Sequence, residues 1–145
     1  PLVPIKHPIR VVMKVDKFDS TGKSAIYHIE SNRYEYLSST FTNGKVTFSA
    51  PKLGEFVLLT DLVAPIITKI SITNRSARLR IRDNLSGIEK IEANIDGKWL
   101  LMRYDYKTGI VQSEQLDSKT MLKGMFELKV TDRAGNDRIF KYRIL

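Results

Sequence analysis

Three aspartates are the residues of this chain best suited to hold a metal ion. Asp61 lies at an expected junction between two modules, whereas Asp83 and Asp132 each end an expected strand at a turn. Carboxylate oxygens are the ligands that hard cations prefer, so these residues are candidates for calcium. Each aspartate could instead accept backbone hydrogen bonds in its own turn. This simpler role leads us to expect no metal and no cofactor, with calcium as the alternative.

The sequence contains few of the residues and motifs on which common enzyme mechanisms depend. Cysteine is absent, which excludes disulfides, thiolate zinc sites and cysteine nucleophiles. The only histidines are His7 and His28, fewer than the roughly three side-chain ligands of a catalytic zinc. His28 lies in an alternating segment and is predicted to be a surface strand residue. The run Thr21-Gly22-Lys23-Ser24 resembles the end of a phosphate loop, but Lys17 occupies the place of its first glycine. We therefore expect no catalytic activity.

Arg78, Arg80 and Arg82 alternate along one expected strand and therefore share one face of it. Guanidinium groups bind carboxylate and phosphate groups, which makes this face a candidate site for an anionic glycan or another anionic ligand. The alternative is an ordinary solvated strand face. Nucleic acid is not an expected partner, because no aromatic side chain is interleaved with the arginines.

The net charge of +8 is distributed unevenly along the chain. Residues 1–63 hold 8 basic and 6 acidic side chains, whereas residues 64–145 hold 16 basic and 10 acidic ones. The second part therefore carries most of the excess positive charge. A basic surface of this kind attracts anionic polymers, although scattered solubilising lysines would produce the same count.

Alternation of apolar and polar side chains recurs along the chain and predicts β-strands. It is clear at residues 11–15, 25–29, 45–48 and 78–82, and turn sequences such as Asn43-Gly44 and Asp96-Gly97 separate the segments. Many short strands at this spacing are typical of β-sandwiches. The sequence therefore predicts an all-β protein made of two tandem β-sandwich modules, and a membrane-spanning helix is not expected because no apolar run approaches about eighteen residues.

A boundary between the two modules is predicted near Val63. The apolar strand that ends near Thr60 is followed by Pro65, which cannot donate a hydrogen bond to a central strand. We therefore expect modules at 1–63 and 64–145. Because the chain begins with Pro1 and has three prolines among its first eight residues, we expect a piece of a longer protein, whose first module could be incomplete at its N-terminus.

The hairpin around Asp96-Gly97 has two possible registers. A two-residue turn pairs Ala93 with Leu100 and directs Leu100 to the core. A three-residue turn with a bulge at Gly97 pairs Ala93 with Trp99 and directs Trp99 and Leu101 inward. We favour the second register, because it buries the only tryptophan of the chain.

Both faces of the segment after this turn are apolar in either register. We therefore expect the first module, a long loop of the second module or an external partner to cover one of them. The residues that make this segment a candidate interface are Trp99, Leu100, Leu101, Met102 and Tyr104.

Several motifs of the second half are similar to a known family. They include Asp83-Asn84-Leu85-Ser86-Gly87, Asp96-Gly97-Lys98-Trp99 and Asp132-Arg133-Ala134-Gly135-Asn136. With these motifs the segment resembles the C-terminal immunoglobulin-like domain of lysostaphin-type metallopeptidases from Bacteroidetes-like bacteria. The resemblance implies an immunoglobulin-like second module and a location outside the cytoplasm, in the periplasm or cell envelope. The family's catalytic His-x-x-x-Asp and His-x-His pairs are absent from the chain.

The resemblance also implies a supporting role. We expect a non-catalytic structural or targeting appendage of a cell-envelope protein that positions a peptidoglycan peptidase domain. Its partners would be an upstream domain of the same polypeptide or an envelope protein, with peptidoglycan as a further candidate. The alternative function is a binding module for an anionic glycan or an envelope protein.

Overall fold

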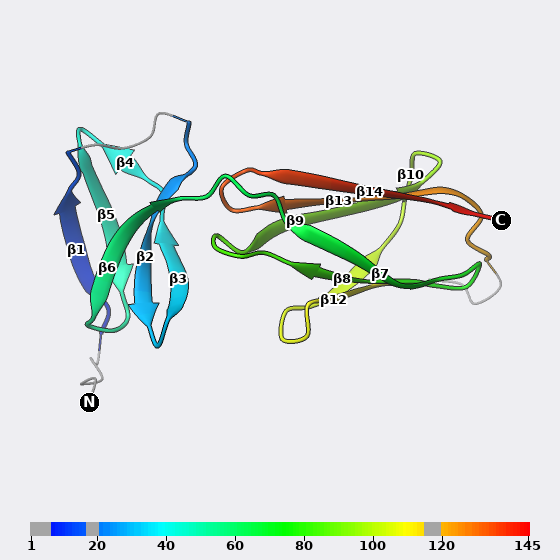
Figure 1. Ribbon diagram of the computed structural model, residues 1–145, viewed down its shortest axis with the longest axis horizontal. Coiled ribbons are helices and arrows are strands. Elements are labelled where there is room, and N and C mark those ends of the chain that lie inside the picture. Colours follow the sequence, from blue (N-terminus) through cyan, green and yellow to red (C-terminus); the bar gives the residue numbers. More distant parts are fainter. Residues whose placement is uncertain (1–6, 17–20, 115–119) are drawn as a thin grey trace. The chain divides into compact units, whose positions relative to one another are not determined.

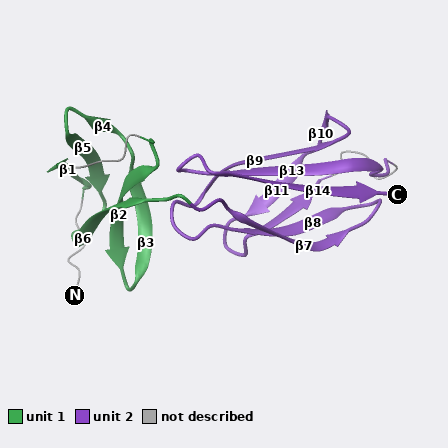
Figure 2. Ribbon diagram, turned by 45° about the horizontal axis from the view of Figure 1, so that its top comes forward, with its two compact units in different colours: residues 1–62 green, residues 63–145 purple. Residues whose placement is uncertain are grey.

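The computed structural model describes residues 7–16, 21–114 and 120–145. Every regular element in these residues is a β-strand, and the strands form four small antiparallel sheets (Figure 1). The all-β prediction is confirmed. The chain divides into two compact units, Pro1–Leu62 and Val63–Leu145 (Figure 2). No helix in the described residues is long and apolar enough to cross a membrane.

The first unit contains two three-stranded antiparallel sheets. Alternation directs Val46, Phe48 and Ala50 of one sheet to the interior, where they pack with Ile26 of the other. The neighbours in the first sheet are, in order, β1 (Ile9–Lys14), β5 (Lys45–Ala50) and β4 (Phe41–Thr42). Those in the second are β3 (Arg33–Ser38), β2 (Ser24–Glu30) and β6 (Glu55–Thr60).

The central strand β2 is buried on both of its faces, and this corrects the prediction for His28. Only 3% of His28 is exposed, and its ring lies 5.4 Å from the ring of Phe56. On the opposite face, Tyr27 is wholly buried and makes edge contacts with Tyr34 and Tyr36. The prediction of a surface histidine was wrong because alternation indicates which side chains share a face, and both faces of a central strand can be covered.

The second unit consists of two four-stranded antiparallel sheets. The neighbours in one are β10 (Lys98–Trp99), β9 (Ile88–Ile95), β13 (Gly124–Asp132) and β14 (Asp137–Ile144), and we call it the β9–β13 sheet. Those in the other are β11 (Met102–Asp105), β12 (Ile110–Ser113), β8 (Ala77–Arg82) and β7 (Ile66–Ile72), and we call it the β8–β12 sheet.

One apolar core joins the two sheets of the second unit. Leu79 and Val111 of the β8–β12 sheet lie in the same buried cluster as Phe126, Leu128 and Val130 of the β9–β13 sheet. Burying each of these side chains contributes about 1.5–3 kcal/mol relative to exposing it. Because the core side chains of β8 alternate with outward ones, this packing fixes which side chains of β8 face solvent.

The Asp96-Gly97 turn has two residues, so the register that we favoured is wrong. Lys98 pairs with Ile95, and Trp99 pairs with Asn94. Both turn residues have positive φ, 48° for Asp96 and 78° for Gly97, as a tight hairpin turn requires. The Asp96 carboxylate also accepts a hydrogen bond of 2.9 Å from the Met125 backbone N–H. Turn chemistry therefore determines the register, and Trp99 is left 71% exposed.

The apolar segment after this turn is not a single strand. The chain leaves the β9–β13 sheet after Trp99 and enters the β8–β12 sheet at Met102. Leu100 and Met102 are half-buried and pack against the core between the sheets. The change of sheet therefore accounts for much of the apolar character of the segment. A partner that covers Trp99, Leu101 and Tyr104 stays a prediction.

Candidate functional site

The outer face of the β8–β12 sheet presents a row of arginines. Arg78, Arg80 and Arg82 are exposed, while the residues that alternate with them in β8 are buried. Pairing with β12 places Gln112 beside Arg78 and Ile110 beside Arg80. None of the three arginines forms an ion pair with a carboxylate in the described part of the chain. Their positive charges are therefore available to a ligand.

The outer face of the β9–β13 sheet differs, because Lys90, Lys129 and Lys141 each have a carboxylate partner within the sheet. Three lysine–carboxylate pairs lie on this face: Lys90–Glu92 at 2.8 Å, Lys129–Asp137 at 2.9 Å and Lys141–Glu127 at 2.8 Å. Two hydrogen bonds lower the pKa of Asp137. The one from the Thr131 hydroxyl has the larger effect, and the one from Lys129 comes second. Exposed pairs of this kind stabilise a fold by little, but they cancel charge locally. The two faces of the second unit thus present different electrostatic surfaces.

A hollow of about 240 Å³ lies at the Arg78 end of the arginine row. Its lining is formed by Arg78, Arg103, Asp105, Thr108, Ile110 and Gln112. The Asp105 carboxylate is held by hydrogen bonds from the Thr108 hydroxyl at 2.8 Å and from the Lys107 N–H at 3.0 Å. Both bonds lower the pKa of Asp105, and the bond from the Thr108 hydroxyl has the larger effect. The hollow therefore offers cationic, amide and hydroxyl groups beside one carboxylate that is already bonded.

A second hollow, of about 350 Å³, lies at the Arg82 end. It is lined by Ile81, Arg82, Asp83, Gly87, Ile88, Tyr104, Tyr106, Lys107, Thr108 and Gly109. Tyr106 is 76% exposed. Burial, and secondarily the charge of Asp105, raises the pKa of Tyr104 above its ordinary value. Gly109 is required here, because a Cβ at this position would lie 2.7 Å from the Ile81 carbonyl oxygen.

The three predicted calcium candidates converge in space. One carboxylate oxygen from each of Asp61, Asp83 and Asp132 lies within 4.8 Å of the other two. Calcium binds oxygens at about 2.3–2.6 Å, so ligands on opposite sides of the ion are up to about 5 Å apart, and the spacing fits. Asp61 and Asp132 are each only 1% exposed.

These aspartates also have the simpler role that was the alternative. The Asp83 Oδ2 accepts hydrogen bonds from the N–H groups of Leu85 at 3.1 Å and Gly87 at 2.8 Å. Asp132 accepts two bonds of 2.8 Å from the backbone and side chain of Asn136. The other oxygen of Asp83, Oδ1, is buried and has no hydrogen-bond partner in the described residues. Turn formation therefore accounts for only part of the cluster, and calcium stays a prediction.

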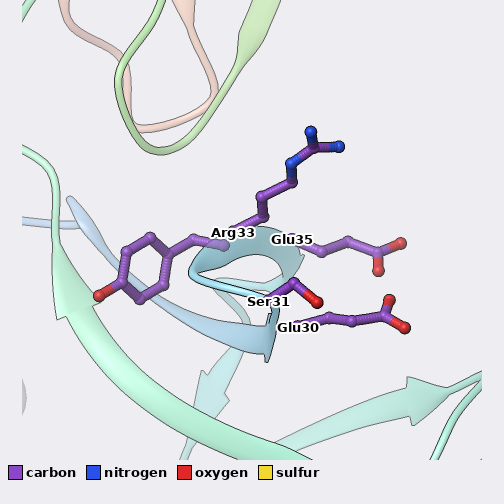
Figure 3. A pocket seen from close by; sticks show the side chains of 5 residues that line it. Glu30, Ser31, Arg33 and Glu35 are labelled. Carbon is purple, nitrogen blue, oxygen red and sulfur yellow. The ribbon is translucent and has the colours of Figure 1, made fainter.

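A further hollow, of about 590 Å³, lies at the tip of the β2–β3 hairpin in the first unit. The side chain of Arg33 points away from those of Glu30 and Glu35 (Figure 3). Glu30 is paired with Lys52 at 2.7 Å, and the hydrogen bond and charge of Lys52 lower its pKa. The side chains diverge from this hollow, so it is a weaker candidate than the arginine row.

Sequence reasoning missed Arg103, Tyr106 and Gln112 as companions of the arginines. Their positions depend on the pairing of β11 with β12 and of β12 with β8. The available signal was the Tyr104-Asp105-Tyr106-Lys107-Thr108-Gly109 stretch, which has the composition of a hairpin turn. Recognising that hairpin would have placed Arg103 beside Gln112.

A family model described as Domain of unknown function (DUF7743) matches residues 59–145. The chain belongs to this family. All three clustered aspartates, the arginine row and both neighbouring hollows lie inside the DUF7743 domain. No curated protein matches the chain.

Among solved structures, the chain is similar to an apo expansin from Clavibacter michiganensis. The TM-score is 0.40 at 13% sequence identity, over 91% of this chain and 74% of the expansin chain. A likeness at this level supports no argument about the function of the DUF7743 domain.

The family match corrects the resemblance to lysostaphin-type metallopeptidases, which was wrong. The family whose model covers residues 59–145 is DUF7743. Two of the motifs that suggested the resemblance, beginning at Asp83 and Asp132, form turns in which the aspartate accepts local backbone hydrogen bonds. Such turns recur in unrelated β-proteins, so these motifs report local geometry rather than family. The family match gives no support to an association with a peptidase.

Proposed function

We propose that the chain is a non-catalytic module that binds an anionic glycan through the outer face of the β8–β12 sheet. The observation that carries this proposal is the row of Arg78, Arg80 and Arg82, which have no carboxylate partner in the described residues. On the opposite sheet, by contrast, Lys90, Lys129 and Lys141 are each paired with a carboxylate. A purely structural appendage has no need of such a row. This favours the binding function over the structural or targeting role.

The chemistry of the face suits a carbohydrate that carries acidic groups. Guanidinium groups donate paired hydrogen bonds to carboxylate, phosphate or sulfate oxygens. Gln112 and Thr108 add amide and hydroxyl groups that can bond to sugar hydroxyls. Because β8, whose inner face is buried, holds the three arginines, their spacing is set before a ligand arrives.

We also infer that the second unit is an immunoglobulin-like sandwich. The support is its strand order, β7-β8-β12-β11 in one sheet and β10-β9-β13-β14 in the other. This order is that of the two sheets of an immunoglobulin-type domain, with one added edge strand. An extracytoplasmic location at the cell envelope, where anionic glycans occur, goes with this proposal and stays a prediction, as does an envelope protein partner.

The test compares binding to an immobilised carboxylated polysaccharide, polygalacturonate, with binding to neutral dextran. The wild-type protein should bind polygalacturonate and not dextran, and added salt should weaken the binding. Replacing Arg78, Arg80 and Arg82 together by alanine should weaken it about tenfold, since each exposed charge pair contributes about 0.5 kcal/mol.

The matched control replaces Lys90, Lys129 and Lys141 by alanine, which removes the same number of positive charges from the opposite face. This control should bind as the wild type does. Equal losses in the two triple variants would show that net charge alone drives the binding, and no loss in the arginine variant would refute the proposed site.

A further inference from the structure

The two hollows of the β8–β12 sheet are neighbours rather than separate sites. Thr108, which lies in the turn at residues 106–109, lines both of them. Arg78 lines one hollow and Arg82 lines the other, with Arg80 between them on the same strand face. The strand face therefore forms a continuous track with a hollow at each end.

Spacing along this track is set by the strand. Alternate residues of an antiparallel strand lie about 6.8 Å apart, so the three arginines extend over about 14 Å. A single small anion can contact one end of such a row only. A ligand that uses all three arginines must be elongated and must carry acidic groups in succession.

Carboxylates stand beside the arginines on this track. Asp105 lines the Arg78 hollow, and its lowered pKa keeps it charged at neutral pH. Asp83 lines the Arg82 hollow. These negative charges repel a ligand whose charge is continuous, such as polyphosphate. They tolerate a ligand in which uncharged segments separate the acidic groups.

An aromatic surface lies at the Arg82 end of the track. Tyr106 is 76% exposed, and Tyr104, 36% exposed, lines the same hollow. Exposed aromatic rings pack well against the apolar face of a flat ring, while neighbouring polar groups bind its substituents. The Lys107 ammonium, 5.9 Å from the centre of the Tyr106 ring, adds a further positive charge there.

From these observations, and resting on the proposed function, we infer that the ligand is a linear acidic polysaccharide whose chain lies along β8. Its acidic groups meet Arg78, Arg80 and Arg82 in turn, and one sugar ring packs on Tyr106. The ligand class is thereby narrowed to polymers in which acidic groups alternate with neutral ring surface, such as polyuronates.

Isothermal titration calorimetry with galacturonic acid, its trimer, its hexamer and polyphosphate tests this inference. Affinity should rise with oligomer length, and the hexamer should bind more tightly than polyphosphate of equal charge. Replacing Tyr106 by alanine should weaken hexamer binding about threefold to tenfold and leave polyphosphate binding unchanged. The control is Trp99→Ala, which removes an aromatic side chain that is 71% exposed on the other sheet.

The outcomes separate this inference from the proposed function. If polyphosphate binds as well as the hexamer and Tyr106→Ala has no effect, the linear track is refuted while anion binding at the arginines stands. The track is also refuted if Trp99→Ala weakens hexamer binding as much as Tyr106→Ala does. If neither the oligomers nor polygalacturonate binds, the proposed function itself fails.

Discussion

Replacing Asp83 by asparagine should stabilise the protein when calcium is chelated and should abolish its response to calcium. In the folded chain, Asp83 shares a space within 4.8 Å with carboxylate oxygens of Asp61 and Asp132. Asparagine has the same size, and its oxygen can still accept the hydrogen bonds from Leu85 and Gly87. Its amide nitrogen can in addition donate a hydrogen bond to a neighbouring carboxylate. The substitution therefore removes charge while keeping the turn.

The magnitude follows from the charges. Two like charges 4.8 Å apart repel by about 3.5 kcal/mol at an effective dielectric constant of about 20. Asp83 is partly exposed, and solvent screening reduces each of its two interactions to about half of that value, or about 3.5 kcal/mol in total. Replacing a charged acceptor by a neutral one weakens two hydrogen bonds by about 1 kcal/mol each. The net stabilisation of Asp83→Asn without calcium is thus about 1.5 kcal/mol.

Calcium should reverse the order of stability of the two proteins. An ion that binds only the folded state at a concentration about 100 times its Kd stabilises that state by about 2.7 kcal/mol. The wild type should gain this amount, whereas Asp83→Asn should gain little. The wild type is therefore expected to be the less stable protein in chelator and the more stable one in calcium.

Urea unfolding with EDTA, with calcium and with magnesium measures these free energies of unfolding. The control is Asp105→Asn, because Asp105 also accepts local hydrogen bonds but is exposed and lies outside the cluster. It should leave the calcium response intact. The calcium site would be refuted if calcium left the free energy of unfolding of the wild type unchanged and Asp83→Asn were less stable than the wild type in EDTA. The aspartates would then act only as hydrogen-bond acceptors in their turns.

Three further predictions concern the strands and turns. Trp99→Ala should change the free energy of unfolding in urea by about 0.5 kcal/mol or less, because Trp99 is 71% exposed; a loss above about 2 kcal/mol would indicate a buried tryptophan. Asn32→Gly should raise the midpoint of urea unfolding by stabilising the fold by about 0.5–1 kcal/mol, because Asn32 has a φ of 62° in a two-residue turn; a lowered midpoint would contradict this. Asp105 has a pKa held below its ordinary 3.8, so its contribution to stability is complete above that value and is lost as pH falls through the folded pKa. Thr108→Val should return this pKa toward 3.8 in an NMR titration, and an unchanged pKa would exclude the hydroxyl as the main cause.

Local pattern was sufficient to predict much of the fold. The alternation in β8 anticipates its three buried and three outward side chains, because a strand with one face on the core has a fixed period of two. The turn sequences Asn43-Gly44 and Asp96-Gly97 lie where the chain reverses, with positive φ at all four residues. These features depend on neighbours in sequence, which a sequence displays directly.

Other features depend on pairing across the fold, and these were missed or misjudged. The sequence favours the register after Asp96 that buries Trp99. The observed register is accompanied by a hydrogen bond from the Met125 N–H to the Asp96 carboxylate, and this bond joins distant parts of the chain that a local pattern does not display. His28 was placed at the surface because the central position of β2 in its sheet cannot be read from alternation. The neighbours of Arg78 come from β11 and β12 for the same reason.

The edge strand β6 has a consequence for handling the protein. It pairs with β2 along one edge and, within the described residues, with no strand along the other. Its four central residues, Phe56, Val57, Leu58 and Leu59, are apolar and half-buried, and the strand contains no proline. Short uncharged segments of this kind form intermolecular β-structure when they are released. Heating past the unfolding of the first unit should therefore lead to irreversible aggregation, and thermal midpoints will depend on scan rate and protein concentration.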